Sequence, residues 1–486
     1  MTNSEYRSRL ITSLFFFISA LALGLPIWIY TTTIDRSLLP DQLQIKNIKY
    51  NIAICVAELP EPLANSISIS SIIENSQILI NDKIKVKAQQ SEKSLFDFNV
   101  EPTITLHYSN CPPSAYPLQF STGSSTFDYE LGRGKDRNIE IFTPFDGAND
   151  VNVSHYLADA LFKIFNSELD RLYQNSNSNN NMKMDYSPNY KLSLSLLHQS
   201  ASGIEWNLNS EPFKAFEAFI HSLSQLTHFT LSSQIGWYSQ LPQTPGEYFV
   251  NSTKIIKDTS NFIDYSGWGL DQDVELDPVI NLIIYIPDKM NPIEIEKSNR
   301  NAFVVPQWGG VVIYNPSKVN NNDEIPLDDF HQILEIWASQ LFQLIGGGTD
   351  NSIFSLYFRI DQLTRLQTIE NIAKTIDNVS SLKKLTQQME TIPIPKKTAI
   401  EIEQAINSIK SALGSIELYN WADALTHSSN GLTLSDKAFF QKDMLQQAYF
   451  PDEHKLAVYS PLIAPMATII ILGLIGRLKE RKVKSE

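Results

Sequence analysis

Two long stretches without a charged residue, one near each end, constrain the fold of this 486-residue chain more than any other feature. Residues 10–34 and 456–476 are mostly apolar, and the second stretch is 21 residues long. Because a helix rises about 1.5 Å per residue, about 20 apolar residues cross the hydrocarbon core of a bilayer. We therefore predict one transmembrane helix at each end, with a large folded region between them.

The first stretch has a second interpretation. Ala20-Leu21-Ala22 resembles the small-residue cleavage site of a secretory signal peptide. The apolar run continues to Tyr30, however, which favours an anchor that stays in the mature protein. Cleavage after Ala22 stays open as the alternative.

The charges beside the two stretches indicate how the chain is oriented. Arg7 and Arg9 precede the first stretch, and five basic residues lie in the tail after the second. Basic residues favour the cytosolic side. We therefore expect residues 1–9 and 477–486 in the cytosol and residues 35–455 in the lumen of the endoplasmic reticulum (ER). In the tail, Lys482 and Lys484 match a dilysine ER-retrieval signal, and the alternative is a plain basic stop-transfer tail.

The charge balance of the middle region excludes one class of function. Residues 37–455 hold 31 of the 39 basic and 49 of the 53 acidic residues, which gives a net charge of −18. Binding to nucleic acid needs a basic surface. We therefore expect no nucleic-acid partner.

Two further patterns agree with a lumenal location. Asn152, Asn251 and Asn378 begin N-glycosylation sequons, whereas proline rules out the one at Asn315. The only two cysteines, Cys55 and Cys111, lie in the same region, where an oxidising lumen permits a disulfide. Two buried free thiols are the alternative, because spacing in the sequence does not show proximity.

The first half of the middle region is predicted to form strands followed by a helix. β-formers that alternate with polar residues predict strands at 49–59, 77–89 and 103–108. Apolar spacings of three and four predict a helix over 155–172. The Asn/Ser-rich residues 174–185 then predict a mobile loop and a candidate sub-boundary.

A second α/β stretch follows that loop. We predict strands at 192–198, 229–238 and 279–286, and a helix that opens at Pro212. Another strand is expected at 310–314, after a bend at Trp308-Gly309-Gly310 in which glycine takes φ values closed to other residues. The alternative for this step is a docking surface for a neighbouring subunit, because tryptophan is favoured at interface hot spots.

The last third is predicted to be helical. One helix is expected to be capped by Asp329 with Gln332 and to end at residues 346–348. Further helices are expected at 356–389 and 402–421, the latter behind a capping box of Thr398 and Glu401. The fold class is therefore α/β: a mixed lumenal region with a helical C-terminal third, flanked by one transmembrane helix at each end.

The sequence contains no pattern that predicts a catalytic residue, a cofactor site or a metal site. Cys111 follows His107 by four residues, but the pair lies between two strand-like runs and is followed by Pro112. HExxH, CxxC, GxSxG and phosphate-loop patterns do not occur. Asp271 and Asp273 form an Asp-x-Asp pattern that glycosyltransferases use to hold a divalent cation, but a solvated acidic turn is the commoner origin.

Four segments, taken in order, resemble a known family. They are LGLPIWIYTTTIDRSLLP (23–40), DPVINLIIYIP (277–287), AFVVPQWGGVVIYN (302–315) and QILEIWASQLFQLIGG (332–347). The chain resembles the PIG-S family subunit of the glycosylphosphatidylinositol (GPI) transamidase complex, and the resemblance includes the two-anchor topology.

The resemblance implies a role in an assembly. That complex removes the C-terminal signal of a precursor protein in the ER and joins the new carboxyl end to a preassembled GPI. A cysteine-protease-like partner subunit carries the catalytic cysteine, so this chain is expected to be non-catalytic. Its expected partners are the other subunits, membrane lipids, GPI and precursor proteins. The alternatives are a membrane-anchored lumenal glycosyltransferase and a lumenal binding or adhesion ectodomain.

Overall fold

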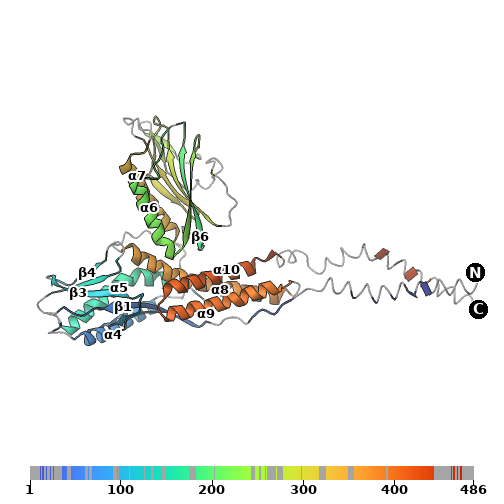
Figure 1. The fold of residues 1–486 in the computed structure, drawn as a ribbon, viewed down its shortest axis with the longest axis horizontal. Coiled ribbons are helices and arrows are strands. Elements are labelled where there is room, and N and C mark those ends of the chain that lie inside the picture. The colour runs from blue at the N-terminus through green and yellow to red at the C-terminus, as the bar shows by residue number, and fades with distance from the viewer. Residues whose placement is uncertain are drawn as a thin grey trace, which may run out of the picture. The chain divides into compact units, whose positions relative to one another are not determined.

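The computed structural model describes most of residues 36–442 and a few scattered residues nearer each end. Within that range it leaves out residues 41–44, 61–63, 65–67, 91–95, 97, 109, 125, 133–135, 145–148, 174–181, 202, 242–246, 251–252, 258, 260–269, 271–276, 297, 317–323, 348–354 and 390–391. The described chain mixes strands and helices as far as residue 313 and is helical from residue 327 onward (Figure 1). The predicted mixed α/β class with a helical C-terminal portion is confirmed.

Most residues of the two predicted membrane segments, 10–34 and 456–476, lie outside the described part of the chain. In the part of the chain that is described, no helix is both long enough and apolar enough to span a bilayer. The two transmembrane helices stay a prediction.

Contacts within the chain group its residues into two units. Residues 45–373 and 409–429 form the larger unit, and residues 1–44, 374–408 and 430–486 form the smaller one. Residues 174–181 of the Asn-rich segment, where the mobile loop is predicted, lie outside the described residues, and Met184 near its end is buried in an apolar cluster of the larger unit. The sub-boundary proposed at that segment stays a prediction.

The first sheet of the larger unit has the strand order β2-β1-β3-β5-β4. Its neighbours are parallel except β4 and β5. The strands are β1 (Asn47–Val56), β2 (Asn99–His107), β3 (Tyr116–Ser124), β4 (Asp128–Leu131) and β5 (Ile139–Pro144). Helix α4 (Ile69–Gln90) makes the crossover from β1 to the parallel β2 and packs against α5 (Asp150–Tyr173). The strands predicted at 49–59 and 103–108 and the helix predicted at 155–172 are confirmed.

The strand predicted at 77–89 is wrong, because these residues belong to α4. The buried side chains of this helix recur every four residues and form one stripe. They are Ile72, Ser76, Ile80 and Ile84. Ile78 and Val86 lie off the stripe and are 55% and 52% exposed. Solvent-facing apolar residues between the buried ones therefore produced the alternation that resembled a strand.

The second sheet of the larger unit has the order β12-β13-β10-β6-β7, with β12 antiparallel and the other neighbours parallel. This confirms the strands predicted at 192–198, 229–238, 279–286 and 310–314. The strands are β6 (Asn189–His198), β7 (His228–Gly236), β10 (Val279–Ile286), β12 (Ala302–Val305) and β13 (Gly309–Ile313).

Both faces of this second sheet are covered. Helices α6 (Glu211–Ser222), which runs into a short 3-10 turn at Leu223–Gln225, and α7 (Leu327–Leu344) pack on one face (Figure 1). A small sheet of β8 (Tyr248–Val250), β9 (Thr253–Ile256) and β11 (Ile293–Ile295) supplies side chains to the apolar cluster on the other. Along β10, Leu282 joins the helix side and Ile283 the opposite side, which explains why the whole strand is apolar.

The glycine pair at the start of β13 serves close packing rather than an unusual backbone angle. The positive φ in this bend belongs to Gln307, at 56°, so the prediction that the glycines adopt such an angle is wrong. A Cβ on Gly309 would collide with the Asn281 backbone of β10, and one on Gly310 would collide with the Gln340 side chain of α7. The missing side chains therefore let β13 fit between β10 and α7.

The ends of α7 confirm one prediction and correct another. The helix begins at Leu327 after Pro326, so Asp329 is not its cap. Instead, the Asp329 carboxylate accepts a hydrogen bond of 2.8 Å from the Tyr314 hydroxyl. The helix stops where predicted, since Gly346 follows it with a φ of 98°.

Three long helices complete the described chain: α8 (Leu356–Gln388), α9 (Lys396–Glu417) and α10 (Trp421–Phe439). The helix predicted at 356–389 is confirmed. The capping box is wrong because α9 begins two residues before Thr398. The helix predicted at 402–421 instead ends at Glu417, and Tyr419, with a φ of 61°, lies in the turn before α10. In the smaller unit, these helices share an apolar cluster that includes Val379, Leu382, Ile402, Ile406 and Ala438.

Candidate functional site

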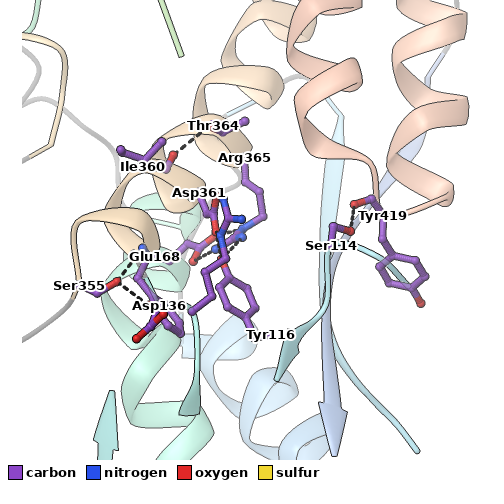
Figure 2. Close-up of polar contacts among 12 residues, drawn as sticks. Ser114, Tyr116, Asp136, Glu168, Ser355, Ile360, Asp361, Thr364, Arg365 and Tyr419 are labelled. Carbon is purple, nitrogen blue, oxygen red and sulfur yellow. Dashed lines mark hydrogen bonds and ion pairs between the residues drawn. The ribbon is translucent and has the colours of Figure 1, made fainter. Parts of the chain in front are cut away.

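Charged and aromatic side chains are buried together where α8 meets the first sheet and α5 in the larger unit (Figure 2). We call Tyr50, Tyr116, Glu168, Asp361 and Arg365 the Arg365 cluster. Arg365 and Asp361 lie one turn apart on α8 and therefore share a face of that helix. Glu168 comes from α5, Tyr50 from β1 and Tyr116 from β3.

The centre of the cluster is a two-pronged ion pair. Arg365 Nε and Nη2 donate to Glu168 Oε1 and Oε2 at 2.6 and 2.8 Å. Their side chains are only 4% and 2% exposed. Burial alone would lower the pKa of Arg365, but Glu168, Tyr116 and Tyr50 together outweigh that effect, so that this pKa lies well above its usual value. Arg365 therefore stays charged at any physiological pH.

Two tyrosines complete the hydrogen bonding around this pair. The Tyr50 hydroxyl donates to Glu168 Oε1. Arg365 Nη1 donates to the Tyr116 oxygen at 2.7 Å, and the Tyr116 hydroxyl donates to Asp361 Oδ2 at 3.1 Å. Burial raises the pKa of both tyrosines well above its ordinary value. Both hydroxyls therefore keep their protons and act as neutral donors.

A second ion pair closes the outer side of the cluster. Arg137, on the segment before β5, donates to Asp361 at 2.6 Å through Nε and at 2.7 Å through Nη2. The Arg137 side chain is 38% exposed, whereas that of Asp361 is 13% exposed. Two guanidinium groups thus balance two carboxylates, so the assembly carries no net formal charge.

This arrangement is suited to holding elements together rather than to proton transfer. A general acid or base must exchange a proton near neutral pH with a reactant within reach. In the Arg365 cluster the carboxylates are paired with guanidinium groups, and the tyrosines titrate far above neutrality. We therefore interpret the cluster as the anchor that fixes α8 to α5, β1 and β3.

The two cysteines form a disulfide in the structure. Cys55 lies near the end of β1 and Cys111 in the connection between β2 and β3, with their Cα atoms 5.5 Å apart. The alternative of two free thiols therefore does not describe this fold. The sulfur of Cys111 is bonded to that of Cys55, so it is no thiol nucleophile for His107 to activate.

The turn between α9 and α10 is attached close to this disulfide. The Ser114 hydroxyl donates to the Tyr419 carbonyl at 2.6 Å (Figure 2). The His107 ring meets the Tyr419 ring edge-on at 5.6 Å, and burial lowers the pKa of that histidine. Trp421 Nε1 donates to the Asn51 carbonyl at 2.9 Å. These contacts fix the Tyr419 turn to the first sheet.

The structure gives the sequon residues different surroundings. Asn152 is exposed in the first turn of α5. Asn378 is half-buried on α8, where its side-chain nitrogen donates to Ser435 Oγ at 3.1 Å and to Asp436 Oδ1 at 2.7 Å. Asn251 lies outside the described residues.

Other candidates also fall outside the described part of the chain. Lys482 and Lys484 of the retrieval signal belong to this group, as do Asp271 and Asp273 of the Asp-x-Asp pattern. Among the residues that are described, three or more His, Cys, Asp or Glu side chains nowhere converge as metal ligands would.

Sequence reasoning missed the Arg365 cluster, although α5 carried a signal. Glu168 falls on the apolar stripe of that helix, between Ile164 and Leu172 at spacings of four. Ionisable residues are rarely fully buried unless they are paired. A glutamate on a core stripe therefore indicates a buried partner, but the partner lies 197 residues away in the sequence and cannot be identified from spacing.

Comparison with protein families gives a clear match over almost the whole chain. Residues 15–484 match the family described as phosphatidylinositol-glycan biosynthesis class S protein, or PIG-S. The chain belongs to the PIG-S family. The family match therefore covers both units of the fold, and it agrees with the resemblance carried by the four sequence segments.

Curated relatives of this PIG-S family member come from fungi and mammals. "GPI transamidase component GPI17" of Saccharomyces cerevisiae is 27% identical over 96% of this chain and 91% of its own length. "GPI-anchor transamidase component PIGS" of Rattus norvegicus is 27% identical over 59% of this chain, which spans little more than half (56%) of that relative. "GPI transamidase component PIG-S homolog" of Schizosaccharomyces pombe is 22% identical over 71% of this chain and 65% of its own length.

Proposed function

We propose that this chain is a subunit of the GPI transamidase complex, which attaches preassembled GPI anchors to the C-termini of precursor proteins. The family match over residues 15–484 is the observation that carries the proposal. The names of the fungal and mammalian relatives support it, since each is called a transamidase component.

Within that complex we assign the chain a non-catalytic role. The chain has two cysteines, and both are used in the Cys55–Cys111 disulfide. A thiolate nucleophile would therefore come from a cysteine-protease-like partner subunit. The anchored α8 fits a scaffold, because the Arg365 cluster fixes a helix whose residues continue from the larger unit into the smaller one.

We place the described region in the ER lumen, with both termini in the cytosol and membrane helices at 10–34 and 456–476. The disulfide supports an oxidising compartment, and the basic residues beside each apolar segment support this orientation. The anchors would hold the lumenal region beside its partner subunits and near lipid-embedded GPI.

Co-purification tests the proposal directly. The full-length tagged chain, extracted in mild detergent, should elute with a stable assembly that includes a cysteine-protease-like subunit. Cells that lack the chain should accumulate GPI precursor proteins with uncleaved C-terminal signals. A solitary, monodisperse chain together with normal precursor processing would contradict the proposal.

A further inference from the structure

Two of the sequons have the same tripeptide sequence. Asn152-Val-Ser and Asn378-Val-Ser are identical, so the tripeptide itself cannot distinguish them. Both asparagines also lie on long helices of the described region, α5 and α8. Any difference in modification between them must therefore come from their surroundings.

Asn152 is compatible with a glycan in the folded protein. It is exposed in the first turn of α5, next to Val151, which is 57% exposed. The contact that fixes this turn uses the backbone, since the Asn152 N–H donates to Asn149 Oδ1 at 2.8 Å. A substituent on the side-chain nitrogen would extend into water without disturbing that hydrogen bond.

Asn378 is not compatible with a glycan in the folded protein. Its side-chain nitrogen donates to Ser435 Oγ and Asp436 Oδ1, both on α10 and both in the smaller unit, as Asn378 is. A primary amide nitrogen carries two hydrogens, so these two bonds use its full donor capacity. A sugar on that nitrogen would remove one donor and occupy the space where α8 meets α10.

We infer that Asn152 carries an N-linked glycan, whereas Asn378 stays unmodified as a residue that joins α8 to α10. Transfer forms a bond between Asn152 Nδ2 and the anomeric carbon of an oligosaccharide. It breaks that carbon's bond to a lipid-linked pyrophosphate, which leaves, and it releases one amide proton. The inference rests on the lumenal location given under the proposed function, because lipid-linked oligosaccharide is used there.

Isotope labelling identifies the modified asparagine. The full-length chain is made in eukaryotic cells and treated with peptide N-glycosidase in ¹⁸O-water, which converts each glycosylated asparagine to labelled aspartate. We expect the label at position 152 and none at position 378. Asn152→Gln should abolish one glycan's shift in gel mobility, whereas Asn378→Gln should leave the mobility unchanged. A glycan on Asn378, or an unlabelled Asn152, would overturn the inference.

A reporter sequon separates this inference from the question of location. Asn209→Thr turns the exposed Asn207 into the start of an Asn-Leu-Thr sequon. If Asn207 is glycosylated in this variant while Asn152 is not, the lumenal location stands and the inference about Asn152 fails. If neither is glycosylated, the lumenal location fails and the inference fails with it.

The joining role of Asn378 has a separate readout. After enzymatic removal of glycans, Asn378→Leu should lower the midpoint of thermal unfolding by about 2–4 °C, because Ser435 and Asp436 lose their shared donor. Asn152→Leu is the matched control and should leave the midpoint unchanged. Equal midpoints for the two variants would contradict the joining role.

Discussion

At the residue scale, the Arg365 cluster differs from the surface ion pairs of this protein in how completely its charges are removed from water. The side chains of Arg365 and Glu168 are 4% and 2% exposed, whereas those of Lys214 and Glu211 on α6 are 59% and 85% exposed. A buried ion pair is weak evidence for net stabilisation. Removing one partner, however, leaves an unpaired charge in the interior. The cluster should therefore respond strongly to the loss of one partner.

Arg365→Met should lower the free energy of unfolding by about 3–5 kcal/mol, because the Glu168 carboxylate is left without its guanidinium. The double variant Arg365→Met/Glu168→Met should recover much of that loss, since no buried charge remains. Urea unfolding followed by tryptophan fluorescence measures both. Lys214→Met is the matched control and should change stability by less than about 0.5 kcal/mol. A similar loss in Lys214→Met and Arg365→Met would refute this account of the cluster.

The tyrosines of the cluster predict how stability depends on alkaline pH. Burial raises the folded-state pKa of Tyr50 and Tyr116 above the ordinary value of 10.0. Above that value the unfolded chain loses these protons while the folded chain keeps them, so stability should fall as pH rises. Each tyrosine can contribute a slope of at most about 1.4 kcal/mol per pH unit.

Urea unfolding at a series of pH values from 9 to 11.5 measures this slope. Tyr50→Phe should make the decline shallower, although it also lowers stability at neutral pH by removing the hydrogen bond to Glu168. Tyr238→Phe serves as the control, because Tyr238 is 71% exposed. A slope that Tyr50→Phe leaves unchanged would count against the prediction.

What the sequence could reveal about single residues depended on how local the signal was. The stop at Gly346 was predictable because a helix end is encoded within a few residues. The roles of Asn378, Glu168 and Gly310 were not predictable, because each depends on a partner from a distant part of the chain. The disulfide was left open for the same reason, since 56 positions separate its cysteines.

At the scale of elements, α4 shows where pattern reasoning fails. The segment Gln77-Ile78-Leu79-Ile80 contains apolar residues on both the buried and the exposed sides of the helix. Strand alternation would place Ile78 and Ile80 on one face, whereas the helix separates them by 200°. By contrast, β10 was predicted to the residue, because an unbroken run of eight mostly apolar residues fits a strand buried on both faces.

Paired alanine substitutions distinguish the two structures of this segment. Ile80 is fully buried and Ile78 is 55% exposed. Ile80→Ala should therefore lower the free energy of unfolding by about 2–5 kcal/mol, and Ile78→Ala by far less. Chemical denaturation of the two variants side by side measures the difference. Comparable losses would indicate that the two side chains share a face, as in a strand.

At the scale of the whole molecule, the Cys55–Cys111 disulfide links the first strand of the larger unit to a connection made 56 residues later. Replacing both cysteines with alanine should lower the free energy of unfolding by about 2–4 kcal/mol. The reason is that the unfolded chain gains conformational entropy when a loop of this length is no longer closed by the disulfide. Thermal unfolding with and without reductant measures the loss. Reductant should destabilise the natural chain and leave the double-alanine variant unaffected. A variant as stable as the oxidised natural chain would contradict the prediction.

The family of the chain could be predicted from its sequence, whereas the contacts between distant parts of the chain could not. The four segments that carry the resemblance lie between residues 23 and 347, and the family match covers residues 15–484. Neither reveals the Arg365 cluster or the Tyr419 turn, because both join parts of the chain that lie far apart in sequence. Long-range pairing of this kind is visible only in three dimensions.

The separation of Glu168 from Arg365 also has a consequence for biosynthesis. The ribosome adds about 5–20 residues per second, so Arg365 follows Glu168 by about 10–40 s. During that interval the strands of the first sheet and α5 are already made, but the carboxylate that belongs in their interior has no counter-charge. The nascent sheet should therefore stay incompletely closed and accessible to chaperones until α8 has been made. Translation of α8 would then set the time at which the N-terminal half of the protein can finish folding.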